Sequence, residues 1–281
     1  MTRKTTDVRP PAVAGMFYPA DRSVLSRNCL SLLAQAEKNL KDRPTGKIFG
    51  IISPHAGYPY SGLTAAHGYT LLSEREFESV IVISPSHREY FDGVSVYPGD
   101  AYSTPLGEIE IDQDLRASIL KKIAPQIMIE SDLGHRMEHA VEVQLPFLQL
   151  KLREFKFLPL VMGDQKPDYC RVLGEAVAEV VKEKRVLVVA SSDLSHYYDY
   201  DKANNLDQVC ANRLKEDNVD GFLEDLEARR CEACGGGPIA SCLIAGKKLG
   251  HTKVDILYHC NSGDSTGDKS AVVGYLSAII S

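Results

Sequence analysis

The sequence predicts an α/β fold, in which a mostly parallel or mixed central sheet carries helices on both faces. Short β-branched runs alternate along the chain with segments of helical periodicity, the order typical of strands joined by helical crossovers. Several runs, such as V-I-V-I (80–83) and V-L-V-V-A (186–190), are continuously apolar, as expected of strands buried on both faces. Because no linker, repeat or low-complexity tract divides the sequence, we expect a single α/β domain over residues 1–281.

Local patterns predict the first helix and the strands. Residues 22–41 place Leu25, Cys29 and other apolar side chains at helical spacing, with Asp21 or Ser23 as the N-cap. Elsewhere, β-branched runs bounded by turn residues predict strands. These strands are expected at residues 47–53, 79–84, 157–162, 185–190, 254–258 and 271–276.

Helical periodicity returns between these strands. The last helix has Pro238 in its first turn and Gly250 just beyond its end. The segment A-Y-S-T-P-L-G-E-I-E-I-D (101–112) instead alternates with period two after a Thr-Pro turn, which predicts a β excursion or hairpin. The helices are expected at residues 61–73, 112–123, 138–151, 167–183, 202–216 and 238–249, and a helical pattern also precedes Cys231.

The composition is that of an ordinary globular chain, with 281 residues of which 44% are hydrophobic and 25% charged. The formal net charge is -6 and the lysines and arginines are scattered, which argues against nucleic acid or an anionic membrane as the main partner. No stretch approaches the roughly 20 consecutive apolar residues of a membrane span. We therefore expect a small molecule or a peptide as the ligand, and the sequence predicts no oligomeric state.

The cysteines and the N-terminus indicate a compartment. The chain has seven cysteines, an odd number, and its start M-T-R-K-T-T-D-V-R-P-P lacks the apolar segment of a signal peptide. Both features are typical of a reducing environment in which thiols stay free. We therefore expect a cytoplasmic protein.

Three of the predicted strands lead directly to a histidine. F-G-I-I-S-P-H ends at His55, V-I-V-I-S-P-S-H ends at His87, and V-L-V-V-A-S-S-D-L-S-H ends at His196. The proline of each S-P pair cannot continue a central ladder, so the strand stops where the histidine begins. Ligands of open α/β sheets bind beyond the carboxyl ends of the strands. We therefore hypothesise that the three imidazoles share one site, although each alone is also typical of a surface or capping residue.

Cys234 lies in R-R-C-E-A-C-G-G-G-P, just ahead of the last predicted helix. Free N–H groups and the helix dipole favour a thiolate there, so we expect a lowered pKa and an exposed, reactive thiol that serves as a nucleophile or a metal ligand. Cys231 and Cys234 form a single C-x-x-C, which is too little for a structural zinc ribbon. The helical pattern before this pair also argues against a thioredoxin-like motif. Core packing is expected of Cys29, Cys170, Cys210 and Cys242.

Other polar residues near the predicted strand ends have alternative interpretations. His139 and Glu142 are three apart on an expected helix, so the carboxylate could orient the imidazole, or the two could form a solvated ion pair. Asp193 precedes His196 by three residues and could hold its tautomer, bind metal or cap a turn. The polar segment C-N-S-G-D-S-T-G-D-K (260–269) fits either a turn or a substrate loop.

These segments together resemble the MEMO family, which occurs in archaea, bacteria and eukaryotes and includes protein B of AmmeMemoRadiSam systems. The resemblance covers nearly the whole chain in order. The family looks like the class III extradiol dioxygenases in fold, with a metal bound by two histidines and a third ligand. The matching segments are V-R-P-P-A-V-A-G-M-F-Y-P (8–19), P-H-A-G-Y-P-Y-S-G, S-P-S-H, Y-S-T-P-L-G, E-H-A-V-E-V-Q-L-P-F-L, S-S-D-L-S-H and N-S-G-D-S-T-G-D.

Carried over by motif, the resemblance implies that His55 and His87 are the histidine ligands, Cys234 is the third ligand, and His196 is the acid/base histidine. The metal would be iron or copper, with zinc as a further alternative. A thiolate departs from the 2-His-1-carboxylate face of the dioxygenases, because it is a softer ligand. Asp193 and His139 complete the expected catalytic set, and the candidate substrate-binding residues within the motifs are Tyr58, Tyr102, Glu142 and Asp264.

Three functions from different classes follow. The first is a metal-dependent redox enzyme, with iron or copper on His55, His87 and Cys234 and with His196 moving a proton. The second is a hydrolase or transferase that uses Cys234 as nucleophile, His196 as base and Asp193 as the orienting group. The third is a non-catalytic protein that binds a peptide or phospho-ligand in the same crevice, as the family's signalling role in eukaryotes suggests.

Overall fold

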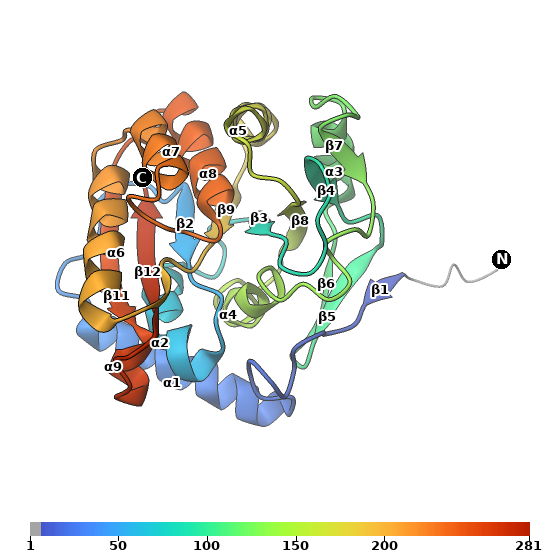
Figure 1. Ribbon diagram of the computed structural model, residues 1–281. Helices are drawn as coiled ribbons and strands as arrows, with labels where there is room; N and C mark the ends of the chain where they lie inside the picture. The colour runs from blue at the N-terminus through green and yellow to red at the C-terminus, as the bar shows by residue number, and fades with distance from the viewer. Residues whose placement is uncertain (1–6) are drawn as a thin grey trace.

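The computed structural model describes residues 7–281 and confirms the predicted α/β class (Figure 1). In this part of the chain, the main sheet has the order β10-β12-β2-β9-β3-β8-β4-β7, and β11 pairs with β12. The four central strands are parallel. They are β2 (Gly50–Ser53), β9 (Val186–Ser191), β3 (Ser79–Pro85) and β8 (Lys156–Met162).

The flanking strands make the sheet mixed rather than wholly parallel. β12 (Val272–Ile280) is antiparallel to β2 and to β11 (Val254–Asn261), and β4 (Val94–Val96) is antiparallel to β8. Short strands complete the two sides, β10 (His196–Tyr198) beside β12 and β7 (Met128–Glu130) beside β4. The sequence did not predict β4, β7 or β10, because three residues are too few to show a period of two.

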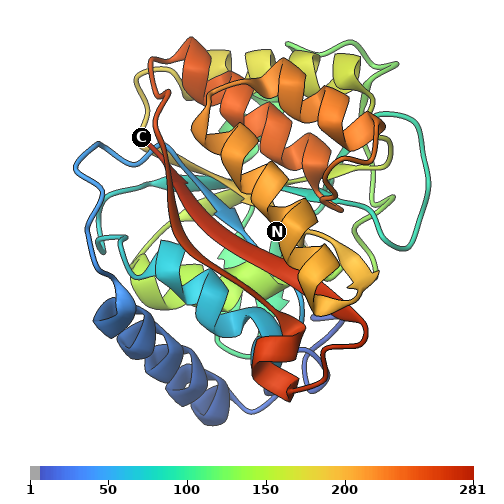
Figure 2. The ribbon, with the colours of Figure 1, turned by 60° about the vertical axis from the view of Figure 1, so that its left-hand side comes forward.

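Helices cover both faces of the sheet. In Figure 1, α5, α7 and α8 lie above it and α1, α2 and α4 lie below it, and Figure 2 shows the same two layers from another side. Helix α5 packs on α8, and α1 packs on α2. The helices are α1 (Arg22–Asn39), α2 (Tyr58–Tyr69), α3 (Gln113–Leu120), α4 (Leu145–Lys151), α5 (Pro167–Val181), α6 (Tyr200–Lys215), α7 (Val219–Glu227) and α8 (Gly236–Lys248).

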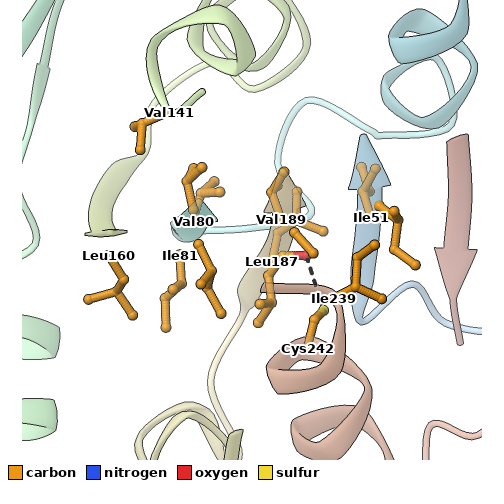
Figure 3. Packing of buried hydrophobic residues seen from close by; sticks show 14 of the residues in the cluster. Ile51, Val80, Ile81, Val141, Leu160, Leu187, Val189, Ile239 and Cys242 are labelled. Atoms are coloured by element: carbon orange, nitrogen blue, oxygen red, sulfur yellow. Dashed lines mark hydrogen bonds between the residues drawn. The ribbon is translucent and has the colours of Figure 1, made fainter. Parts of the chain in front are cut away.

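The core consists of apolar side chains from the central strands and from the helices that cover them. Ile81 and Leu160 are fully buried in neighbouring strands. Figure 3 shows these side chains in rows, with Ile239 and Cys242 of α8 against one face of the sheet and Val141 on the other. Packing on both faces explains why the sequence of these strands is continuously apolar. The cysteines expected in the core are buried, namely Cys29, Cys170, Cys210 and Cys242.

The predicted β excursion is confirmed as a hairpin of β5 (Ala101–Thr104) and β6 (Gly107–Glu110), which forms a separate sheet with β1 (Val8–Arg9). The polar segment 260–269 contains the short helix α9 (Ser262–Thr266). Among the described residues, no helix combines the length and the apolarity that crossing a membrane requires.

The helix expected at residues 138–151 begins later than predicted. A 3-10 turn, η1 (Glu142–Gln144), leads into α4. The reason is local, because the Glu138 carboxylate accepts the backbone N–H groups of His139 and Ala140, both at 2.9 Å. Those groups are thereby held in a turn, and Glu138 and His139 lie on the loop before the helix.

Candidate metal centre

The site lies beyond the carboxyl ends of β2, β3 and β9. Ser53 of β2 is paired with Ser191 of β9, so the loops that follow these two strands leave the sheet side by side. A backbone bond from Ser192 to Ser53 and a 2.7 Å bond from the His55 N–H to the Asp193 carboxylate tie the loops together. This is the edge at which an α/β sheet places ligands.

His55, His87 and Cys234 meet at this edge. One ligand atom from each residue lies within 4.8 Å of the others. The rings of His55 and His87 are edge to face with centroids 5.0 Å apart, and the Cys234 Sγ lies 3.1 Å from the His55 Nε2. Two imidazoles and a thiol at this separation form a set of donors that iron, copper or zinc could bind.

Hydrogen bonds at the far side of two rings fix where their protons lie. The His87 Nδ1 is 2.9 Å from the Glu138 carboxylate, and the His196 Nδ1 is 2.8 Å from the Leu194 carbonyl. A carbonyl or carboxylate oxygen can only accept, so each Nδ1 carries a proton, and in the neutral form of each ring the lone pair is on Nε2. Neutral imidazole with a free lone pair is the form that binds metals.

Glu138 is the outer support of the site that the sequence analysis missed. It is buried and accepts hydrogen bonds from the backbone N–H and the Nδ1 of His87, at 2.6 and 2.9 Å, as well as from the backbone of the next two residues. Burial alone would raise its pKa, but the bonds from His87 and the nearby His139 outweigh burial and lower the pKa to about 2. Although Glu138, His87 and His139 also form a cluster with metal-ligand spacing, these bonds identify Glu138 as a partner of the histidines.

His139 is a third imidazole at the centre. Its ring centroid lies 4.6 Å from that of His87 and 5.4 Å from that of His55, and Phe17 packs on it at 4.7 Å. Burial, followed by the neighbouring His55, lowers its pKa to about 4, so the ring is neutral at physiological pH. Its buried Nδ1 lies 3.2 Å from the Glu138 Oε1, although within residues 7–281 it makes no hydrogen bond of good geometry. His139 is therefore a neutral imidazole that lies beside the Glu138 carboxylate and the rings of His55 and His87.

The predicted pairing of His139 with Glu142 is wrong, and so is the alternative of a solvated ion pair. Glu142 is fully buried and accepts bonds from Arg9 at 2.7 Å and from the Tyr18 hydroxyl at 2.5 Å. It also accepts the backbone N–H groups of two residues in the N-terminal segment. Because Glu138 rather than Glu142 faces the imidazoles, the sequence analysis chose the wrong one of two carboxylates four residues apart.

The other expected substrate-binding residues have structural hydrogen bonds. The buried Tyr58 hydroxyl donates to the Val143 carbonyl at 2.7 Å, and the buried Tyr102 hydroxyl lies 2.7 Å from the His135 Nδ1. Asp264 accepts the Asn261 N–H at 3.0 Å as part of the cap of α9, and also a bond from a tyrosine hydroxyl. A role for these residues in binding substrate stays a prediction.

Asp193 does not orient His196. Its carboxylate accepts the His55 N–H, whereas the His196 ring is held by the Leu194 carbonyl. Burial raises the pKa of Asp193. The aspartate therefore fixes the backbone of the His55 loop, and the orienting role that the sequence suggested for it is wrong.

Cys234 has the predicted position before α8 but not the predicted thiolate environment. The first free N–H groups of that helix are taken by side chains, because Gly235 donates to the Ser192 Oγ and Gly237 donates to the Gln165 Oε1. The thiol is half-buried, and burial together with the nearby Asp193 raises its pKa. In the metal-free protein Cys234 is thus a neutral thiol that can donate to the His55 Nε2.

A cavity of about 670 Å³ adjoins the centre. Its wall contains Cys234 and His196, apolar side chains such as Leu223 and Leu226 of α7, and the charged side chains of Glu227, Arg229 and Glu232. The volume lies in the range of several hundred Å³ that is typical of small-molecule sites.

The chain is similar to known proteins over almost its whole length. The family model described as "Memo-like protein" matches residues 9–279. A MEMO1 family protein of Methanosarcina mazei is 38% identical over 98% of this chain and 99% of its own, and one of Sulfolobus acidocaldarius is 38% identical over 96% and 98%. Among solved structures, an uncharacterized protein of Escherichia coli K12 superposes with a TM-score of 0.54 at 13% identity, over 83% of this chain and 100% of its own. That likeness concerns the fold alone.

Proposed function

The chain belongs to the Memo-like protein family, and from this membership and the site geometry we propose that it is a metal-dependent redox enzyme. Iron or copper is held by His55, His87 and Cys234, with zinc as the alternative metal. The observation that carries the proposal is the convergence of these three ligand atoms within 4.8 Å of one another.

The donor set fits a soft or borderline transition metal. Imidazole suits iron, copper and zinc, whereas a thiolate favours the softer of these ions over magnesium or calcium. The thiol of Cys234 must lose its proton to become a ligand, and burial raises the pKa of that thiol. Metal binding therefore releases a proton and weakens as the pH falls.

Bound iron or copper would supply Lewis acidity and one-electron chemistry, whereas zinc would supply Lewis acidity alone. The chain itself supplies proton carriers, since the Nε2 of His196 has no hydrogen-bond partner among residues 7–281 and His139 is held neutral beside the ligands. His196 lies in the wall of the 670 Å³ cavity, so it can reach a small molecule or peptide there. We assign proton transfer to His196 and an assisting role to His139.

One observation favours a second candidate function, a thiol-dependent hydrolase or transferase. The Cys234 Sγ and the His55 Nε2 are 3.1 Å apart, which is within reach for a nucleophile and its base. In such an enzyme the base would be His55 rather than His196. The raised pKa of the thiol argues against it, because the reactive form is the thiolate.

Metal analysis tests the proposal. Protein purified without oxygen should contain stoichiometric iron or copper, and Cys234→Ser should lose it because a hydroxyl is a poor replacement for a thiolate. Cys231→Ser is the matched control, since Cys231 is buried outside the donor set. Metal should also protect Cys234 from alkylation, as measured by mass spectrometry. Equal labelling with and without bound metal would contradict the proposal, and a metal-free protein inactivated by alkylation would support the thiol enzyme.

We further propose a reducing, cytoplasmic setting. All seven cysteines are free thiols, including the half-buried Cys234 and Cys260. Thiols of this kind persist where disulfides are kept reduced. Fractionation of the native host cell, with detection by antibody, is the direct measurement.

A further inference from the structure

A buried chain of hydrogen bonds leads from the core to the His55 ring. The His55 Nδ1 lies 2.9 Å from the Ser191 Oγ. The same hydroxyl lies 2.7 Å from the Ala140 carbonyl and 2.8 Å from the Gln144 Nε2. All of these groups are fully buried or nearly so, so their bonds cannot be exchanged for bonds to water.

The direction of each bond follows from its fixed ends. The Pro54 carbonyl can only accept, so the group of Gln144 that lies 3.0 Å from it is the NH2. The carbonyl oxygen of the same amide then accepts the Tyr69 hydroxyl at 2.7 Å. Gln144 therefore presents an N–H, not an oxygen, to Ser191.

Ser191 has one proton and two lone pairs to distribute. The proton goes to the Ala140 carbonyl, which can only accept, and one lone pair takes the N–H of Gln144. The remaining lone pair can only accept from His55. The His55 proton therefore lies on Nδ1, and its Nε2 lone pair faces the Cys234 thiol.

We infer that Ser191 is a positioning residue, which holds His55 in the tautomer that binds metal through Nε2. The inference rests on the proposed metal site, and it assigns a role to a residue that the sequence analysis did not single out within the S-S-D-L-S-H segment. Outer partners of metal-bound histidines orient the ring in this way, and their loss typically weakens metal binding by about 10–100-fold. In this chain a serine on β9 performs that role for His55, as Glu138 does for His87.

The tautomer can be measured without metal. In metal-free protein with 15N-labelled histidine, NMR distinguishes a protonated ring nitrogen from an unprotonated one, and a His55→Gln spectrum identifies the His55 signals. We expect the proton on Nδ1. Ser191→Ala removes the acceptor, so the proton should move to Nε2, where it can donate to Cys234, and iron or copper affinity should fall about 10–100-fold.

Two further variants distinguish a positioning role of Ser191 from a purely structural one. Ser84→Ala is the matched control, because Ser84 is a buried serine at the end of β3 whose hydroxyl donates to the Pro85 carbonyl at 3.2 Å. It should change neither the tautomer nor the affinity. Ser191→Thr retains the hydroxyl and should retain both properties.

The outcomes distinguish this inference from the proposed function. A proton on Nε2 of His55 in the unaltered protein, or an unchanged tautomer in Ser191→Ala, would overturn the inference even if metal binds normally. If the His55 tautomers are as expected but the protein binds no metal, the role of Ser191 is supported and the proposed metal enzyme is contradicted. If Ser191→Ala does not fold, the tautomer of His55 in the unaltered protein still tests the inference.

Discussion

At the scale of single residues, the centre contains side chains that can bind a metal and other side chains that only position those ligands. His55, His87 and Cys234 present ligand atoms to one another, whereas Glu138 and Ser191 bind the far side of the histidine rings. His196 belongs to neither group, because its Nδ1 is held by a backbone carbonyl and its Nε2 has no hydrogen-bond partner in the described part of the chain. This division of roles leads to two predictions.

His196→Ala should leave metal content nearly unchanged, because the residue is outside the set of converging ligand atoms. The loss should instead affect proton transfer. We expect the metal-loaded variant, supplied with a reductant, to take up oxygen about 10²–10⁴-fold more slowly than the unaltered protein. His55→Ala is the comparison and should lose the metal. Equal loss of metal in both variants would show that His196 is a ligand.

Glu138→Gln should weaken metal binding by about 10–100-fold, because the amide has only one acceptor oxygen and cannot accept both the Nδ1–H and the backbone N–H of His87. The free energy of unfolding should also fall by about 1–3 kcal/mol, since a buried N–H loses its partner. Metal titration and urea unfolding measure the two effects. Glu232→Gln is the control, because Glu232 lines the neighbouring cavity but accepts its bond from Tyr198. A Glu138 variant that bound metal as tightly as this control would contradict the assigned role.

At the scale of secondary-structure elements, a buried ion pair fastens the N-terminal segment to the loop of the site. Arg9 of β1 binds Glu142 of η1 at 2.7 Å, and its other nitrogens donate to the carbonyls of His135 and Glu138. Both charged side chains are almost completely buried. The segment that carries Glu138 and His139 is thus held in position by a residue more than a hundred positions away in sequence.

Arg9→Met should lower the free energy of unfolding by about 3–5 kcal/mol, because it leaves the buried Glu142 carboxylate without its cation. Arg43→Ala removes an ion pair with Glu37 in which both side chains are exposed, and should cost no more than about 1 kcal/mol. Urea unfolding of both variants is the measurement. Equal destabilisation by the two substitutions would mean that the buried Arg9 ion pair contributes no more to the free energy of unfolding than the exposed one.

The sequence could predict the parts of the site that depend on neighbouring residues, but not the parts that depend on distant contacts such as the Arg9–Glu142 ion pair. The sequence predicted the positions of His55 and His87 because each directly follows an apolar strand that ends at Ser-Pro, a signal contained in a few neighbouring residues. It could not choose between Glu138 and Glu142. That choice depends on where η1 begins and on Arg9, and neither is encoded in the local pattern. Cys234 was identified from its glycines, but the direction of its pKa shift was wrongly predicted, because burial and the nearby Asp193 raise the pKa and depend on other elements of the fold.

At the scale of the whole molecule, the sheet brings together parts of the chain that are far apart in sequence. β2, β3 and β9 contribute their ends in parallel, and the loop before α8 adds the cysteine. The alternating pattern predicted this class of fold, because strands buried on both faces are recognisable from composition alone. It predicted the antiparallel flanks less well, since strand direction depends on pairing rather than on local sequence.

Burial of neutral histidines should make the metal-free protein sensitive to acid. Burial lowers the pKa of His135 to about 3 and that of His139 to about 4, from ordinary values near 6.5. The unfolded chain therefore binds protons between pH 6.5 and these values while the folded protein does not. Stability is fully present above pH 6.5 and falls as the pH is lowered, by up to about 1.4 kcal/mol per pH unit for each such histidine.

His135→Gln tests the contribution of one of these histidines to acid sensitivity, and His135 is not one of the proposed metal ligands. The amide can donate to the Ser95 carbonyl and accept the Tyr102 hydroxyl, as the imidazole does, but it does not titrate. Urea unfolding of the metal-free protein at intervals from pH 6.5 to 4 should therefore show a slope of stability against pH that is shallower by about 1.4 kcal/mol per unit. An unchanged slope would mean that His135 takes up a proton in the folded state, and that acid sensitivity arises from the histidines of the site.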